Sequence, residues 1–248
     1  MKRIILMVIK VLYLIPGLFI RMNRMKKPGA ATEEEKLAML RERMEKANKA
    51  GHVTIQPVGL ENVPEKDGFL YTPNHQGLYD VLAFLVTSPR PFGVVMKKSV
   101  SNIILIKQFR ELVGGLALDR EDVRDGLRVI KQMSEAVKSG RNFLIFPEGT
   151  RSRQGNITGE FKAGPFKAVQ YAKCPIVPVA MIDSYRPFDE GHCRPVTVEI
   201  HYLKPIPYEE VADLKTHQIA ELVKSRIDDE IARTLAAREA AAQTPASE

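Results

Sequence analysis

The sequence predicts an α/β fold: a mixed, mainly parallel sheet flanked by helices, preceded by two further helices. Three observations support this prediction. Short runs rich in β-branched and apolar residues recur between residues 52 and 208. Several of these runs are separated by stretches with helical periodicity, which are the connections that parallel strands require. The first 50 residues show two helical patterns and no strand pattern.

The predicted strands begin directly after the second of these helical patterns. They are Val53–Val58, Phe69–Thr72, Phe92–Met96, Leu116–Leu118, Asn142–Phe146, Ile176–Ile182 and Val196–Leu203. The last of them alternates apolar and polar residues, as a strand with one exposed face does. Intervening helices are expected at Leu78–Thr87, Asp122–Lys138 and Pro165–Ala172.

The C-terminal part reads as one long helix from Glu209 to about Ala237, followed by a frayed tail from Ala240. The whole pattern divides the chain into N-terminal helices (1–50), an α/β domain (51–240) and a flexible tail (241–248).

The most apolar segment runs from Ile4 to Ile20 and is interrupted by Lys10 and by Pro16-Gly17. As a helix these 17 residues would reach about 25 Å, which is less than the roughly 30 Å of a hydrocarbon core. The simplest interpretation is an anchor that lies in one leaflet with both ends on the cytoplasmic face, Lys10 extending to the headgroups. A single membrane span and a cleaved signal peptide ending near Gly29-Ala30-Ala31 are the alternatives.

The formal charge of +7 comes entirely from this apolar segment and the residues that flank it. Residues 1–27 contain seven Lys or Arg and no acid, so residues 28–248 are formally neutral. Basic residues around an apolar helix are suited to anionic membrane lipids. A neutral body without a basic stripe argues against a nucleic-acid-binding protein.

A second helix is predicted after Pro28-Gly29. Thr32 and Glu35 have the spacing of a capping box, and an apolar stripe follows before Gly51. This helix either packs on the domain as an ordinary surface helix or pairs with the first one as a two-helix membrane-associating motif.

Three polar motifs follow predicted strands. The first is Asn74-His75-Gln76-Gly77-Leu78-Tyr79-Asp80. On a regular helix a separation of five residues would keep His75 and Asp80 apart. With His75 in the preceding turn, Asp80 can accept a hydrogen bond from one imidazole nitrogen and leave the other as a base. By itself, the pattern also fits a structural pair in which Asp80 caps the helix.

The second motif is Phe146-Pro147-Glu148-Gly149-Thr150-Arg151-Ser152, and the third is Gly114-Gly115-Leu116-Ala117-Leu118-Asp119-Arg120. Ligands bind at strand ends in open α/β sheets, and an arginine offers a planar fork that matches a phosphate. Each motif alone also fits an exposed polar turn.

Together the motifs resemble those of the glycerolipid acyltransferase family, and specifically the 1-acylglycerol-3-phosphate acyltransferases. NHxxxxD is matched by Asn74, His75 and Asp80, a Gly–apolar–Asp-Arg run ends at Arg120, and FPEGTRS is matched at 146–152. A proline-containing apolar strand, Ile176-Val177-Pro178-Val179, follows. Gly77 and Ala117-Leu118 depart from the serine and the Phe-Ile pair that are frequent in the family.

The resemblance implies a role for each matching residue. His75 would be the general base and Asp80 its orienting partner. Arg120 and Arg151 would bind the phosphate of the acceptor, with Lys97 and Lys162 as weaker phosphate candidates. The residues expected to shape the site around the glycerol are Glu148 and Gly149, with Thr150 as a further binding residue.

The implied reaction moves an acyl group from acyl-CoA or acyl carrier protein to the sn-2 hydroxyl of lysophosphatidic acid, without a metal or other cofactor. Glycerol-3-phosphate or another lysophospholipid is the alternative acceptor. A non-catalytic lipid-binding protein of the membrane is the alternative outside the enzymes, although such a protein has no use for a poised base.

Overall fold

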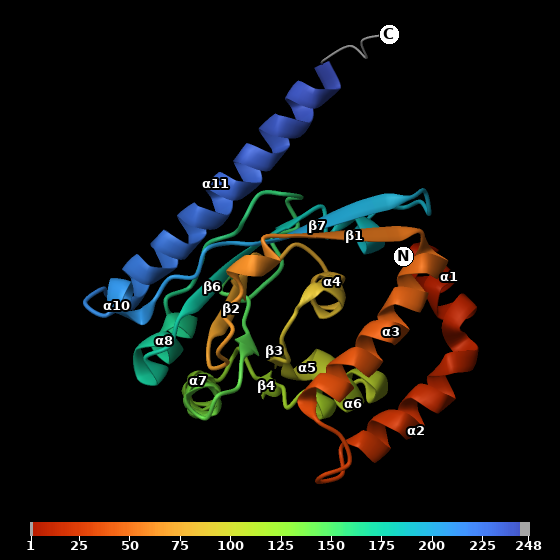
Figure 1. Cartoon of the computed structure of the whole chain (residues 1–248), viewed down its shortest axis with the longest axis horizontal. Coiled ribbons are helices and arrows are strands. Elements are labelled where there is room, and N and C mark those ends of the chain that lie inside the picture. Colours follow the sequence, from red (N-terminus) through yellow and green to blue (C-terminus); the bar gives the residue numbers. More distant parts are fainter. Residues whose placement is uncertain (1, 244–248) are drawn as a thin grey trace.

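In the computed structural model, residues 2–243 are described and form a seven-stranded sheet with helices on both faces (Figure 1). The strand order is β1-β7-β6-β2-β5-β3-β4. The strands are β1 (Val53–Val58), β2 (Leu70–Pro73), β3 (Gly93–Lys97), β4 (Leu116–Leu118), β5 (Phe143–Leu144), β6 (Ile176–Ile182) and β7 (Val196–Tyr202).

Five of these strands, β2 to β6, are parallel to one another. β7 runs antiparallel to β6, and β1 pairs with β7 in parallel. The predicted mixed, mainly parallel sheet is therefore confirmed. β5 is shorter than the predicted strand, although the N–H of Ile145 still donates to the carbonyl of Tyr71.

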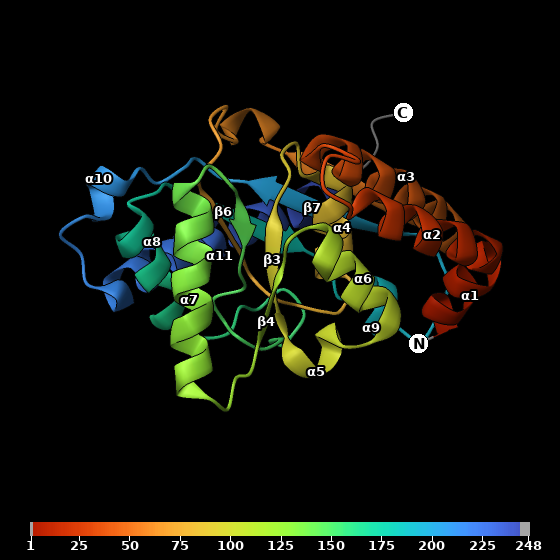
Figure 2. The same ribbon diagram turned by 90° about the horizontal axis from the view of Figure 1, so that it is seen from below.

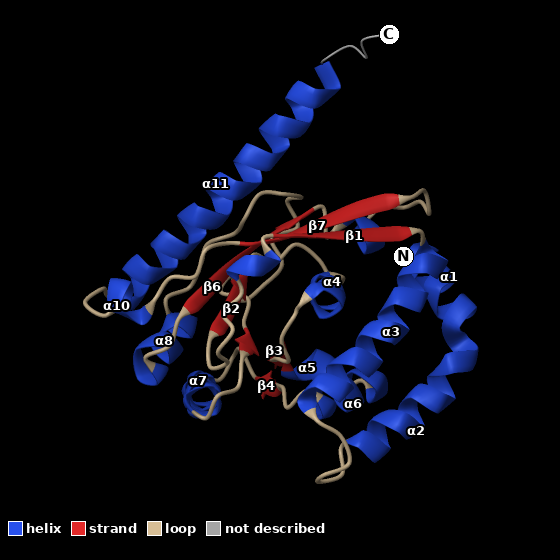
Figure 3. Cartoon of the chain, viewed as in Figure 1, coloured by secondary structure: helices blue, strands red, loops and turns tan. Residues whose placement is uncertain are grey.

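Helices cover both faces of the sheet, as the colouring by secondary structure shows (Figure 3). They are α1 (Lys2–Val11), α2 (Ile15–Met25), α3 (Glu33–Gly51), α4 (Asp80–Thr87), α5 (Lys98–Ser101), α6 (Ile104–Leu112), α7 (Val123–Lys138), α8 (Lys167–Ala172), α9 (Arg186–Asp189), α10 (Tyr208–Val211) and α11 (Thr216–Gln243). Short 3₁₀ turns lie at Leu12–Leu14, Leu60–Asn62 and Gly164–Phe166.

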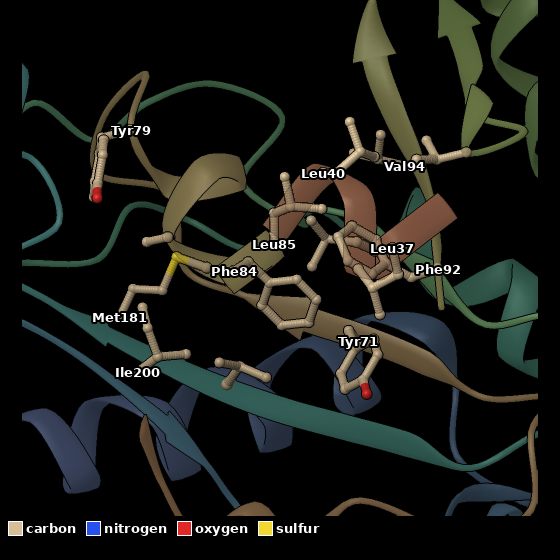
Figure 4. Close-up of a cluster of buried hydrophobic side chains, with 14 of the residues drawn as sticks. Leu37, Leu40, Tyr71, Tyr79, Phe84, Leu85, Phe92, Val94, Met181 and Ile200 are labelled. Carbon is tan, nitrogen blue, oxygen red and sulfur yellow. The ribbon is translucent and has the colours of Figure 1, made fainter. Parts of the chain in front are cut away.

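Two hydrophobic clusters fill the space between the sheet and its helices. One joins the sheet to α1–α4; its centre is shown in Figure 4, where Leu37 and Leu40 of α3 meet Phe84 of α4 and Tyr71 of β2. The other cluster lies on the opposite face, under α7, α8 and α11. Because successive residues of a strand point to opposite faces, Leu70 and Tyr71 belong to different clusters.

The capping box at the start of α3 is confirmed. Thr32 Oγ1 accepts from the N–H of Glu35, and the Glu35 carboxylate accepts from the N–H of Thr32. The apolar stripe of α3 contributes Leu37, Leu40 and Ala47 to the core. α3 packs on the domain, against α4 and β1, and it also pairs with α1, so the structure combines the two interpretations.

The N-terminal segment is longer than the apolar run indicated. Lys2–Met25 forms one helical stretch, with a 3₁₀ turn at Leu12–Leu14, that is long and apolar enough to cross a membrane. Its 24 residues reach about 36 Å. The expected length of about 25 Å counted only Ile4–Ile20 and was too short.

This segment lies against the body of the protein. Figure 2 shows α1, α2 and α3 together at one side, away from α7 and α8. Arg3 is fully buried and donates to the backbone carbonyl of Arg194, and Lys26 pairs with Glu111 at 2.8 Å. Lys10 donates to the carbonyl of Ala50 at 3.4 Å, so it extends to the end of α3 and not to the headgroups.

Three further boundaries differ from the prediction. α4 begins at Asp80 because the N–H groups of Gln76 and Gly77 bond to the Asp80 side chain. The C-terminal helix is broken between α10 and α11, where the Gln218 side chain accepts from the N–H of Lys215. α11 continues to Gln243, so the helix does not end near Ala237, and residues 244–248 of the expected tail lie outside the described part of the chain.

The polar face of β7 is exposed at Thr197, as predicted, but not at its other end. His201 is buried, with its ring nitrogens 2.5 Å from Glu230 of α11 and 2.8 Å from Glu199. Charged side chains of α11 cover this end of the face. A strand alternates apolar and polar residues in the same way whether the polar residues meet solvent or charged partners.

Candidate active site

Four adjacent parallel strands end at the site. Their sheet order is β2-β5-β3-β4. The loops after β2, β5 and β4 contain His75, Glu148 and Arg120, and Lys97 is the last residue of β3. Parallel strands present their carboxyl ends at the same edge of a sheet, so the topology places all three motifs on that edge. This is the edge where open α/β sheets bind ligands.

His75 and Asp80 are in direct contact. His75 Nδ1 lies 2.7 Å from Asp80 Oδ2, and the Asp80 side chain is fully buried. The same carboxylate accepts from the N–H of Gln76 at 2.7 Å and from the N–H of Gly77 at 3.0 Å. His75 Nε2 has no hydrogen-bond partner within residues 2–243, and the side chain is 15% exposed. The arrangement leaves one nitrogen available to a ligand.

The imidazole is also held by an aromatic contact. The rings of His75 and Phe146 stack with centroids 4.1 Å apart and an interplanar angle of 28°. Phe146 was part of a predicted motif, but its position beneath the histidine was not predicted, because the two residues are 71 positions apart.

Glu148 connects the two motif loops through backbone groups. Its Oε1 accepts from the N–H of His75 at 2.7 Å, and its Oε2 accepts from the N–H of Gly159 at 3.0 Å. Burial raises the pKa of this carboxyl, although the two N–H donors and the neighbouring His75 oppose the shift. The side chain therefore shapes the site by holding the backbone on either side of it.

The turn after Glu148 is also tied to the first motif. Gly149 has a φ of 68°, and the N–H of Ser152 donates to the carbonyl of His75 at 2.8 Å. A Cβ at Gly149 would lie 3.4 Å from the ammonium nitrogen of Lys162, so the Lys162 side chain passes over this turn. Thr150, which follows Gly149, is exposed.

The cationic candidates have no internal partner. Within residues 2–243, the side chains of Arg120, Arg151, Lys97 and Lys162 make no ion pair or hydrogen bond. These four side chains are therefore available to an anionic ligand.

The turn that carries Arg120 is ordered by its neighbours. Asp119 pairs with Lys98 at 3.4 Å, and its N–H donates to Asp125. Asp122 caps α7 by accepting from the N–H groups of Arg124 and Asp125.

Several residues that build the site were missed. Ser184 donates to the Asp80 carboxylate, Asn156 accepts from Gln76 at 2.9 Å, and Asn74 bonds to the backbone of Met181. Ser184 and Asn156 stand outside the recognised motifs and more than 75 positions from their partners, so no local pattern indicates them.

Comparison with known proteins is consistent with this site. A sequence model described as Acyltransferase matches residues 54–182, which include His75, Arg120 and the 146–152 motif. The chain belongs to this acyltransferase family. The match covers the strands from β1 to β6, so it includes every site residue predicted from the sequence.

Relatives within the acyltransferase family have informative names. A 1-acyl-sn-glycerol-3-phosphate acyltransferase of Saccharomyces cerevisiae is 32% identical over 184 residues, covering 71% of this chain and 59% of that protein. The protein of the same name from Escherichia coli is 30% identical over 176 residues, covering 69% and 71%. For several of the relatives, including one from Brassica napus, the match spans only about half of their length.

A solved acyltransferase structure has the same fold. The 1-acyl-sn-glycerophosphate (LPA) acyltransferase PlsC from Thermotoga maritima superposes with a TM-score of 0.78 at 19% identity, covering 95% of this chain and 98% of that one. The agreement extends over the N-terminal helices as well as the sheet.

Proposed function

We propose that this protein transfers an acyl group from a thioester, acyl-CoA or acyl carrier protein, to the sn-2 hydroxyl of lysophosphatidic acid, forming phosphatidic acid. The observation that carries this proposal is the His75–Asp80 contact, with Nε2 of the imidazole left unpartnered at the ligand-binding edge of the sheet. The names of the relatives support the choice of acceptor.

In the proposed mechanism His75 acts as the general base. Asp80 accepts from Nδ1–H, which fixes the tautomer and leaves Nε2 to take the proton of the acceptor hydroxyl. The oxygen attacks the thioester carbonyl, the C–S bond breaks, and the imidazolium returns the proton to the departing thiolate. The thioester is the co-substrate, and no further cofactor is required.

The unpaired cations supply the attraction for the phosphate of the acceptor. Arg120 and Arg151 are the principal ligands because a guanidinium can donate two parallel hydrogen bonds to a phosphate. Lys97 and Lys162 add positive charge at the same edge. Because none of the four forms an ion pair in the described part of the chain, they favour an anionic ligand.

The N-terminal helices would hold the enzyme on the cytoplasmic face of a membrane, where both amphiphilic substrates reside. α1 and α2 pack against α3 and α6, and their outer face is apolar. A helix that crosses the membrane would have to separate from the domain. Because these helices are attached to the domain along their length, a position within one leaflet is favoured.

The test is an acyl-transfer assay with the full chain in anionic phospholipid vesicles. Labelled acyl-CoA and acyl carrier protein serve as donors, and lysophosphatidic acid, glycerol-3-phosphate and lysophosphatidylcholine as acceptors. We expect labelled phosphatidic acid, and a loss of at least about 100-fold in kcat for His75→Ala.

Thermal melting checks that the variant remains folded. Product from another acceptor alone would replace lysophosphatidic acid in the proposal. Full activity of the folded His75→Ala variant would contradict the assignment of the base.

A further inference from the structure

Asp183 and Ser184 form a tight turn directly after β6, the strand next to β2 in the sheet. Asp183 has a φ of 61°, which is in the left-handed region, and Ser184 is completely buried. A left-handed conformation at a residue other than glycine costs of the order of 1 kcal/mol and persists where surrounding contacts enforce it.

The turn places a hydroxyl on the far side of the His75–Asp80 pair. Ser184 Oγ donates to Asp80 Oδ1, whereas His75 bonds to Oδ2. The N–H of Ser184 donates to the Gln76 side chain at 2.8 Å. Because the hydroxyl contacts the carboxylate and not the imidazole, His75 cannot activate Ser184 as a nucleophile.

We propose that Ser184 is a positioning residue, which fixes the Asp80 carboxylate in the plane that His75 requires, and that Asp183 and Arg238 hold Ser184 in place. This proposal rests on the proposed function. It extends the His75–Asp80 pair to a third residue, from a strand that contributed no candidate residue to the predicted site.

Asn156 supports the turn from one side. Its Oδ1 accepts from the N–H of Asp183 at 2.8 Å and from Gln76 Nε2 at 2.9 Å, and its Nδ2 donates to Asp183 Oδ1 at 3.0 Å. One asparagine therefore connects the strained residue to the loop that follows His75.

α11 supports the turn from the other side. Arg238 Nη1 donates to Asp183 Oδ2 at 2.7 Å, and its Nη2 donates to Glu199 Oε1 of β7 at 2.6 Å. The two contacts lock the guanidinium between β6 and β7. The contacts continue without a break from Arg238 through Asp183 and Ser184 to Asp80.

Removal of the Ser184 hydroxyl takes away the side-chain donor to Asp80 Oδ1. The N–H groups of Gln76 and Gly77 still hold the carboxylate, but its orientation toward His75 is less tightly fixed. We therefore expect kcat to decrease by about tenfold, the equivalent of one hydrogen bond, while the KM of the acceptor is unchanged.

The experiment compares kcat and the KM of the acceptor for wild type, Ser184→Ala and Ser134→Ala in the acyl-transfer assay. Ser134 is a similarly buried serine whose hydroxyl donates to the Ile130 carbonyl within α7, so its loss should leave both constants unchanged. Arg238→Gln tests the same chain of contacts from the partly exposed end, and the same selective decrease in kcat is expected. If Ser184→Ala does not melt cooperatively, Arg238→Gln tests the positioning role in its place.

The outcomes separate the two proposals. Wild-type kcat in folded Ser184→Ala, with His75→Ala inactive, would overturn the positioning role and leave the proposed function intact. A wild-type protein that transfers no acyl group to any acceptor would refute the proposed function, and the positioning role with it.

Discussion

Gly149 occupies a backbone conformation that favours glycine. Its φ of 68° lets the chain reverse after Glu148, so that Glu148 reaches the N–H of His75 while Ser152 donates to the His75 carbonyl. The conformation of this one residue therefore decides whether the two motif loops meet.

Gly149→Ala should destabilise the protein by about 1 kcal/mol, because a Cβ in the left-handed region is strained. Acyl transfer should also decrease, since the Glu148 contacts depend on this turn. Gly126→Ala is the matched control: Gly126 lies inside α7 with no atom within 4 Å of its added Cβ, so it should gain up to about 1 kcal/mol. Urea denaturation measures the free energy of unfolding of both variants, which should fall for Gly149→Ala and rise for Gly126→Ala. An equal change in both variants would contradict this interpretation.

Arg120 and Arg151 should affect a different kinetic constant from the proposed base His75. Their side chains are unpaired within the described residues, so their replacement by alanine should raise the KM of lysophosphatidic acid with little change in kcat. Each lost hydrogen bond to the charged phosphate should raise the KM by roughly 10- to 100-fold. An unchanged KM in steady-state kinetics would assign the phosphate to other residues.

Among the elements, α11 is attached to the sheet by buried charges as well as by apolar residues. His201 lies between Glu199 and Glu230, and Arg238 reaches Glu199 and Asp183. Burial alone would raise the pKa of Glu199, but the hydrogen bonds from Arg238 and His201 outweigh it and hold that pKa below its ordinary value. Glu230 has the same balance, with Arg233 and His201 as donors.

These lowered pKa values predict acid sensitivity. A carboxylate whose pKa is lower in the folded state stabilises that state above its unfolded pKa, and the contribution is lost as the pH falls through the folded pKa. For Glu199 and Glu230 the loss occurs below about pH 4.5.

The double variant Glu199→Gln/Glu230→Gln should be about 2 kcal/mol less stable at neutral pH and lose less stability between about pH 7 and pH 3 than wild type does. Urea denaturation at several pH values measures both effects. Glu42→Gln, which removes an exposed pair with Lys46, is the control and should barely change the profile. If the double variant lost as much stability at low pH as wild type, groups other than Glu199 and Glu230 would be responsible for the acid sensitivity.

For the whole molecule, the N-terminal helices have two distinct faces. Met7, Met22 and Met25 pack into the core, whereas Ile9, Tyr13 and Ile20 are 65%, 77% and 68% exposed. An exposed apolar face on helices that are already packed on the domain indicates contact with lipid without any rearrangement of the fold.

Replacement of Tyr13 and Ile20 by serine should weaken binding to anionic vesicles by at least about tenfold, because each side chain contributes about 1.5–3 kcal/mol when buried in the membrane. The fold should remain intact, since neither side chain belongs to the core. Tyr171→Ser on α8 is the control for an exposed tyrosine away from these helices. Co-sedimentation with vesicles measures the effect; unchanged binding of the double variant would contradict the proposed membrane face.

Much of this arrangement could be predicted from the sequence. The spacing of apolar runs predicted the strands and the mainly parallel sheet, and the five-residue separation predicted that a His75 outside the helix could meet Asp80. The capping box of α3 was predicted in the same way, because its hydrogen bonds join residues three positions apart. These features depend on short-range geometry.

Contacts between distant segments required the tertiary structure. Local periodicity and short motifs determined the element types, the sheet class and the catalytic candidates. The stacking of Phe146 on His75, the contact of Glu148 with the N–H of His75 and the support of Asp80 by Ser184 depend on the strand order β6-β2-β5. A linear pattern does not encode which strands become neighbours. The folded sheet brings residues about 70 to 110 positions apart within hydrogen-bond distance, and this long-range packing decided how the site is supported.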